Sequence, residues 1–236
     1  MADVNGLVLV EGRPGSGRTA IAEDLARWLA GEQVAVGHRS EGQADHPVDV
    51  DHVVVLDTAQ LLALAAESAQ TSRALLGAAE QHGEAWVVRP ASEAALPEPL
   101  RERVREVASH ARVPAELTAS LVADAWARFG ANGPRGVHVW ESVLLGSADV
   151  TLVCRLVDAV RAHRPAVVYL DDDREVGSSR QGRRRELDLV VLAGLDVPTL
   201  VVPVGDGRRD DHTAAVRDFV ADHLGLAGRG DSQQVA

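Results

Sequence analysis

Residues 6–20 of the chain, GLVLVEGRPGSGRTA, join an apolar run to a glycine-rich loop. The apolar run ends at a glycine, which is typical of a short buried strand. The loop matches the phosphate-binding pattern Gly-x-x-x-x-Gly-Lys-Ser/Thr at Gly12, Gly17 and Thr19, with Arg18 in place of the lysine. Apolar residues recur at helical spacing after the loop. A strand, a glycine-rich loop and a helix are the context that the pattern requires.

The glycines of this loop allow the backbone to curl so that consecutive N–H groups point at phosphate oxygens. The dipole of the following helix adds positive potential at the same place. The residues expected to bind the phosphates of a nucleotide are Gly12, Arg13, Pro14, Gly15, Ser16, Gly17, Arg18, Thr19 and Ala20. The Thr19 hydroxyl is expected to be a ligand of Mg²⁺.

Arg18 keeps the positive charge of the usual lysine but is longer, planar and forked. It can still grip phosphate through two parallel hydrogen bonds. Phosphoryl transfer depends on the placement of charge on the moving group, so binding is expected to survive the change more readily than chemistry. All 24 basic side chains are arginine, and no lysine elsewhere in the chain can take over the role.

Composition limits the other classes of function. The chain has 236 residues, 46% of them apolar, which is enough for one large α/β domain. The formal net charge of −11 argues against a nucleic-acid or anionic-membrane partner, because both surfaces are negatively charged. The nine histidines show no spacing typical of a metal site made by the protein alone. The chain opens without a signal-peptide pattern and has no bilayer-length apolar run, so a cytoplasmic protein is expected.

Five apolar strands alternate with helices along the chain. This order predicts an α/β fold with a five-stranded parallel sheet covered on both faces, and a ligand crevice at the carboxyl ends of the strands. The strands are expected within residues 6–12, 33–38, 136–142, 166–173 and 197–207. Residues 57–80 have a helical pattern. A single domain is predicted over residues 1–226, with a helical insertion at about 90–130 that is broken at Pro114, and a disordered tail at 227–236.

The order of these motifs resembles that of the P-loop kinases of the nucleoside- and nucleotide-kinase type, thymidylate kinase among them. VEGRPGSGRT resembles their Phe-Glu-Gly-x-x-Gly-Ser-Gly-Lys-Ser/Thr loop, and VHVWES resembles their third strand. PAVVYLDDDREVGSSRQGRRRE is similar to their fourth strand and arginine-bearing lid, and VPTLVVPVGDG to their last strand. The resemblance is closest to bacterial kinase-like proteins with EGLPGSGKS-type loops and a His-Pro near the second strand. It covers most of the chain but not residues 55–130.

The resemblance implies roles for residues at the ends of the later strands. Glu141 would be the general base for an acceptor hydroxyl or a partner of Mg²⁺, and Asp171 would hold the water shell of the metal. Catalytic lid arginines are expected at Arg180 and Arg183, beside Arg184 and Arg185. The alternatives are a solvated strand terminus for Glu141, a polar strand end for Asp171, and a solvated basic helix face for the arginines.

The resemblance also places Asp206 near the adenine, and Glu41 and His46 in the loop where substrate usually sits. A histidine on the surface of that loop is the favoured interpretation of His46. The implied function is an ATP- and Mg²⁺-dependent kinase acting on a hydroxyl of a nucleoside, nucleotide, sugar or secondary metabolite. The alternative is a catalytically weak or inactive nucleotide-binding module with a regulatory or scaffolding role. Related kinases often dimerise, which leaves a homodimer open.

Overall fold

A computed structural model describes residues 4–43, 45–48, 50–108, 113–146, 149–172, 179–205 and 209–226. Within 179–205, the side chains of residues 179–181 are not described. The chain forms two compact units: unit 1 comprises Met1–Glu41 and Trp126–Ala236, and unit 2 comprises Gly42–Ala125. The predicted tail at 227–236 lies outside the described residues.

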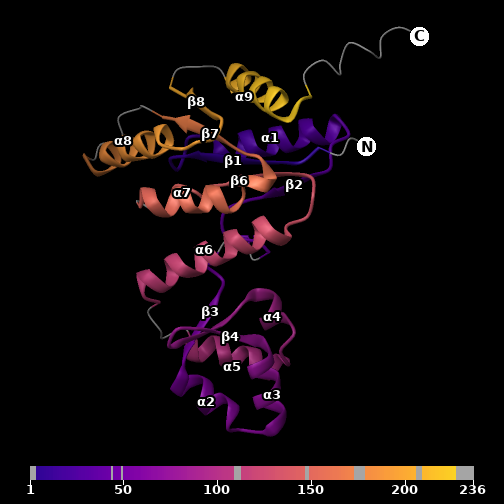
Figure 1. The fold of residues 1–236 in the computed structure, drawn as a ribbon, viewed down its shortest axis with the longest axis vertical. Helices are drawn as coiled ribbons and strands as arrows, with labels where there is room; N and C mark the ends of the chain where they lie inside the picture. The colour runs from indigo at the N-terminus through magenta and orange to yellow at the C-terminus, as the bar shows by residue number, and fades with distance from the viewer. Residues whose placement is uncertain are drawn as a thin grey trace. The chain divides into compact units, whose positions relative to one another are not determined.

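Unit 1 contains a five-stranded parallel sheet with the strand order β2-β6-β1-β7-β8 (Figure 1). The strands are β1 (Gly6–Gly12), β2 (Val36–Arg39), β6 (Val137–Glu141), β7 (Pro165–Asp171) and β8 (Thr199–Pro203). β1 is the central strand, and its end is aligned with the ends of both neighbours: Val10 pairs with Glu141, and Gly12 pairs with Leu170. The predicted parallel sheet is confirmed, and it gathers the ends of β1, β6 and β7 at one edge.

Helices cover both faces of this sheet, as predicted. Helices α1 (Arg18–Gly31) and α9 (Arg209–Leu224) pack on one face through an aliphatic cluster that includes Val8 and Val10. The opposite face carries α7 (Val150–Ala159), followed by a short 3-10 helix (Arg161–His163), and α8 (Ser179–Ala193) (Figure 1). The end of α6 (Ala115–Asn132) packs there as well, since Trp126 meets Trp140 edge to face with ring centroids 5.8 Å apart. Alternation along β1 therefore points Val8 and Val10 to one face and Glu11 to the other.

Unit 2 has its own antiparallel sheet, with the strand order β3-β5-β4. Its elements are β3 (Val54–Asp57), α2 (Thr58–Ala65), α3 (Ala69–Ala78), β4 (Ala79–His82), β5 (Ala85–Val88), α4 (Pro90–Ala94) and α5 (Glu98–Ala108). Buried aliphatic side chains from these helices and strands form a separate core that includes Leu56, Leu75 and Val104. The single predicted domain therefore contains two compact units, and the second of them is larger than the expected helical insertion.

The helical pattern of residues 57–80 is interrupted in the structure. Ser68 caps α3 by accepting a hydrogen bond from the Thr71 N–H, which separates α3 from α2. The chain then becomes strand β4 at Ala79, so the last residues of the predicted helical stretch are extended. The predicted break at Pro114 is confirmed, because α6 begins at Ala115. No helix among the described residues is both long and apolar enough to span a bilayer.

Candidate phosphate-binding site

The glycine-rich loop connects the end of β1 to the start of α1 and has the backbone conformation that its glycines permit. Gly12, Gly15 and Gly17 have φ angles of 147°, 86° and 91°. A Cβ atom at Gly12 would lie 2.7 Å from the Leu170 carbonyl oxygen, so this glycine is required by close packing against β7. A Cβ atom at Gly15 or Gly17 would meet no atom within 4 Å. The loop is therefore packed at its start and open over its second half.

The start of α1 presents unsatisfied donors to this open space. Gly17 is the N-cap residue, and within the described chain no side chain caps the helix. The first turn also contains no acidic residue to offset the helix dipole. The Ser16 side chain is only 8% exposed, and its Oγ has no hydrogen-bond partner among the described residues. Free N–H groups, a positive dipole and a buried hydroxyl together suit an anionic ligand.

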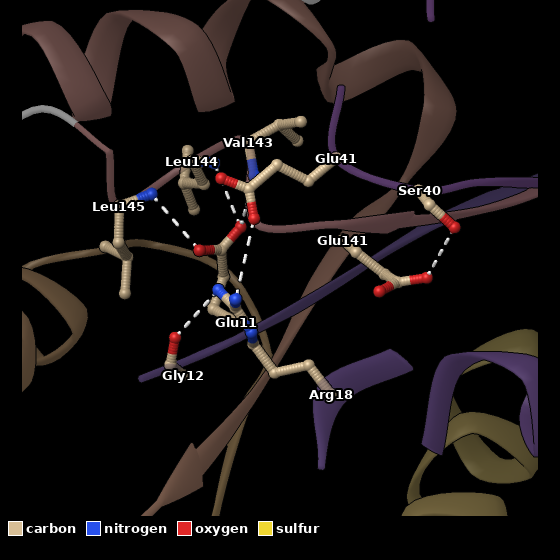
Figure 2. A network of polar contacts seen from close by, with 9 residues as sticks. All are labelled: Glu11, Gly12, Arg18, Ser40, Glu41, Glu141, Val143, Leu144 and Leu145. Carbon is tan, nitrogen blue, oxygen red and sulfur yellow. Dashed lines mark hydrogen bonds and ion pairs between the residues drawn. The ribbon is translucent and has the colours of Figure 1, made fainter. Parts of the chain in front are cut away.

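Arg18 folds back onto the loop. Its Nη1 donates a hydrogen bond to the Gly12 carbonyl oxygen at 2.9 Å, and its Nη2 lies 3.5 Å from Glu41 Oε2 (Figure 2). The Arg18 side chain is 18% exposed, so its cation is held beside the loop instead of in bulk solvent. The structure thus brings together Arg18 and Glu41, two residues that the sequence assigned to phosphate and to substrate.

Glu11, to which the sequence patterns gave no role, is buried at the end of β1. Its Oε1 accepts hydrogen bonds from the Val143 and Leu144 N–H groups at 3.0 and 2.9 Å, and its Oε2 accepts one from Leu145 at 3.3 Å (Figure 2). Burial raises the pKa of Glu11 to about 7, against the opposing effects of these N–H groups and of the Arg18 charge. The signal in the sequence is a charged residue within an otherwise aliphatic strand.

Glu141 ends β6 and is only 3% exposed, so the solvated strand terminus considered for it is wrong. Its Oε1 lies 2.7 Å from His38 Nε2 and accepts a hydrogen bond from Ser40 Oγ at 3.0 Å (Figure 2 shows the serine contact). Both partners come from the end of β2 and the residues after it, because β2 is the neighbour of β6 in the sheet. Sequence reasoning missed His38 and Ser40, whose only signal is their place at the end of a predicted strand.

Asp171 ends β7 and is bound by Arg185 from α8. The Arg185 Nε and Nη2 donate to the two carboxylate oxygens at 2.5 and 2.6 Å. The described part of the chain contains no group of three or more His, Cys, Asp or Glu residues that could hold a metal ion. Thr19, the other expected metal ligand, is exposed in the first turn of α1. The metal roles of Thr19 and Asp171 stay predictions.

The arginines expected to form a lid differ from one another in the structure. Arg184 pairs with Asp188 of the same helix at 3.0 Å, and Arg185 pairs with Asp171 of β7, so a solvated helix face is wrong for Arg185. Asp188 also accepts a hydrogen bond from the Tyr169 hydroxyl at 3.3 Å, and burial raises the pKa of both groups. These contacts attach α8 to β7. Arg183 is exposed on the same helix, and the Arg180 side chain lies outside the described residues.

The other residues expected from the sequence lie in both units of the chain. His46 lies in unit 2 and is buried, which contradicts its expected surface position: its Nδ1 accepts a hydrogen bond from the Val48 N–H at 3.3 Å and closes the turn around Pro47. In the phosphate loop, Arg13 Nη1 donates to the Asp172 carbonyl oxygen at 3.2 Å. Pro14 is exposed and Ala20 is partly buried at the start of α1. Asp206 lies outside the described residues.

No protein-family model matches the chain, and no curated protein sequence matches it significantly. Among solved structures, the crystal structure of APE1195 is 14% identical, with a TM-score of 0.46 over 94% of this chain and 97% of that one. An unliganded sugar kinase from Janibacter sp. HTCC2649 is 13% identical, with a TM-score of 0.40 over 94% and 96% of the two chains. A putative kinase from Chloroflexus aurantiacus is 14% identical, with a TM-score of 0.38 over 96% and 99%. These similarities are low, and the function is therefore argued from the geometry of the site.

Proposed function

We propose that the protein is an ATP-dependent phosphotransferase that moves the γ-phosphoryl group to a hydroxyl of a small molecule such as a nucleoside, nucleotide, sugar or secondary metabolite. The observation that carries the proposal is the loop between β1 and α1. Its glycines have positive φ angles, it is open above Gly15 and Gly17, and it ends at an uncapped helix N-terminus. Such a loop binds phosphate through its backbone N–H groups.

The residues of the loop fit a nucleotide. The buried Ser16 Oγ, which has no hydrogen-bond partner among the described residues, adds a donor to the same cradle. Arg18 supplies the positive charge, and it would exchange the Gly12 carbonyl and Glu41 for phosphate oxygens. ATP, when bound, supplies the phosphoryl group that is transferred. Asp206 is proposed to lie beside the adenine.

Glu141 is proposed as the general base for the acceptor. Its Oε1 is engaged by His38 and Ser40, which fix the orientation of the carboxylate. Its Oε2 is then the atom that would take the proton of the acceptor hydroxyl. Glu41 is proposed to contact the acceptor, and Arg180 and Arg183 to stabilise charge on the transferred group.

Mg²⁺ is proposed as the cofactor of this nucleotide. A magnesium ion in a kinase site usually takes one or two protein ligands beside phosphates and waters. The exposed hydroxyl of Thr19 fits a direct ligand. Asp171 would join the water shell of the metal only after releasing Arg185, which now engages both of its oxygens.

One observation favours a catalytically inactive nucleotide-binding module as a second candidate. Arg18 donates to the Gly12 carbonyl of its own loop and pairs with Glu41, so its charge is partly neutralised within the protein. A module of this kind would bind nucleotide and show no turnover with any acceptor in a panel of nucleosides, nucleotides and sugars. Transfer to any of them supports the phosphotransferase.

The phosphate loop is tested by calorimetric titration with Mg²⁺-ATP. Gly17→Val should abolish binding, because the new side chain occupies the open space above the loop. Gly83→Val is the matched control: Gly83 has a φ of 61°, a Cβ there also meets no atom within 4 Å, and it lies in unit 2. Both variants strain the backbone by roughly 1–3 kcal/mol, so only the phosphate contact separates them. Absence of binding to the wild type at millimolar nucleotide, or unchanged binding in Gly17→Val, refutes the proposal.

A further inference from the structure

Glu11 occupies a distinctive place in the sheet. It is the residue immediately before Gly12, the first glycine of the phosphate loop, and it faces away from the α1 side of the sheet. Its carboxylate is only 2% exposed. The groups that satisfy it are the backbone N–H groups of Val143, Leu144 and Leu145, which follow Glu141 by a few residues. The residue that precedes the phosphate loop therefore holds, through its side chain, the segment that follows Glu141.

The segment after Glu141 is shaped to make this contact. Ser142 has a φ of 58°, a left-handed conformation that is unfavourable for a residue with a Cβ atom. Its N–H donates to the Val10 carbonyl oxygen at 3.1 Å, and the turn that results directs the next N–H groups at Glu11. A buried carboxylate and a left-handed serine are both unfavourable alone, and each is compensated only while they are joined.

We propose that Glu11 is a positioning residue of the phosphotransferase site, tying the first residue of the phosphate loop to the segment that follows the base Glu141. This inference rests on the proposed function. The hydrogen bonds of Glu11 fix the spacing between the loop that binds the phosphates and the strand end that carries Glu141. Loss of the tie would loosen both loops together.

The charges around Glu11 predict how the tie responds to nucleotide. Arg18 from α1 is the charged group that acts on it, and from β7 its register partner Tyr169 is an uncharged phenol. Residues 143–145, after β6, contribute backbone N–H groups, and Glu141 itself is turned to His38 and Ser40. Phosphates at Arg18 add negative charge and compete for its guanidinium. Both effects favour the protonated form of Glu11, so nucleotide should bind more tightly as pH falls through about 7.

The tie is tested without nucleotide by amide hydrogen exchange. Glu11→Leu removes every acceptor at similar volume, and Glu11→Gln keeps one acceptor oxygen. We expect the amides of residues 143–145, and those of Ser16 and Ile21, which donate to the Arg13 and Gly17 carbonyl oxygens at the phosphate loop, to exchange at least about tenfold faster in Glu11→Leu, with a smaller increase in Glu11→Gln. Glu93→Gln, which alters a buried glutamate of unit 2, should leave both segments unchanged. Faster exchange confined to residues 143–145, or to neither segment, overturns the proposal. If Glu11→Leu does not fold, Glu11→Gln decides by the same criterion.

The second readout is calorimetric affinity for Mg²⁺-ATP at about pH 6 and about pH 8. Between about pH 8 and about pH 6, the nucleotide affinity of the wild type should rise several-fold more than that of Glu11→Gln. The rise seen in Glu11→Gln is the pH dependence that does not come from Glu11. Glu93→Gln should behave as the wild type. An unaltered pH dependence in Glu11→Gln overturns the positioning role. If the Glu11 variants exchange faster in both segments but the wild type binds no nucleotide, the tie is supported and the phosphotransferase is contradicted. The two failures are therefore distinguishable.

Discussion

At the scale of single residues, Arg18 tests whether the altered loop is functional. If its guanidinium serves the phosphates, Arg18→Ala removes a charge-assisted contact and should weaken nucleotide binding by about 1.5–3 kcal/mol. Arg18→Lys should keep binding and raise turnover, because it restores a compact charge. Affinity and turnover of the three proteins give the comparison. An alanine variant that binds as tightly as the wild type would show that Arg18 does not contact phosphate.

The raised pKa of Glu11 also predicts how the stability of the protein depends on pH. Its folded pKa of about 7 lies above the ordinary value of 4.5, so the folded state binds its proton more tightly than the unfolded state. Its stabilising contribution is therefore complete below about pH 4.5 and is lost as pH rises through about 7, a change of about 3 kcal/mol. Denaturant unfolding across this pH range should show that the free energy of unfolding of the wild type falls relative to that of Glu11→Gln as pH rises. Parallel curves would contradict the raised pKa.

At the scale of elements, helix α8 carries both the arginine that attaches it to the sheet and the arginines proposed to act in catalysis. Arg185 attaches it to β7 through Asp171, whereas Arg183 is exposed on the same helix. Arg183→Ala should lower turnover more than nucleotide affinity, as should Arg180→Ala, and Arg183→Ala should leave the free energy of unfolding unchanged. Steady-state kinetics and calorimetry measure the two effects. Equal losses of turnover and affinity, or no loss, would assign these arginines to solvent.

Arg185→Ala should act differently because it leaves the buried Asp171 carboxylate without its guanidinium. We expect a loss of about 1–3 kcal/mol in the free energy of unfolding, reduced by the partial exposure of the Arg185 side chain. Denaturant titration measures it, with Arg183→Ala as the control on the same helix. Stability equal to that of the control would mean that the pair does not hold α8 in place.

The sequence predicts some of these elements and contacts and misses others. Strand β1 and helix α1 were predictable because the first is a long aliphatic run that ends at glycine and the second is a clear helical repeat that follows the glycine-rich loop. The contacts of Glu141 were not, since His38 lies 103 residues earlier and meets it only because β2 pairs with β6. Strand β4 was missed for another reason: its sequence, AEQH, contains no apolar run and continues the helical pattern before it. Local pattern thus predicts elements, whereas partners depend on the order of strands in the sheet.

At the scale of the whole molecule, the two units have separate cores, and this separation predicts how ligand binding and stability are linked. Leu25 is buried in unit 1 on the helix that presents its N-terminus to the phosphate loop, and Leu75 is buried in the core of unit 2. Alanine at either site should cost about 2–5 kcal/mol in the unit that contains it. Only Leu25→Ala should also weaken nucleotide binding, because it disturbs the seating of α1.

Nucleotide should correspondingly stabilise the unit that binds it. A ligand that binds only the folded form raises stability in proportion to the logarithm of its concentration over its Kd, so Mg²⁺-ATP should slow amide exchange in the buried strands of unit 1. Exchange in β3, β4 and β5 should stay the same if their stability depends on the separate core around Leu75. Exchange measured with and without nucleotide, in the wild type and in Leu75→Ala, tests this. Equal protection of both sheets by nucleotide would mean that the units unfold as one cooperative body.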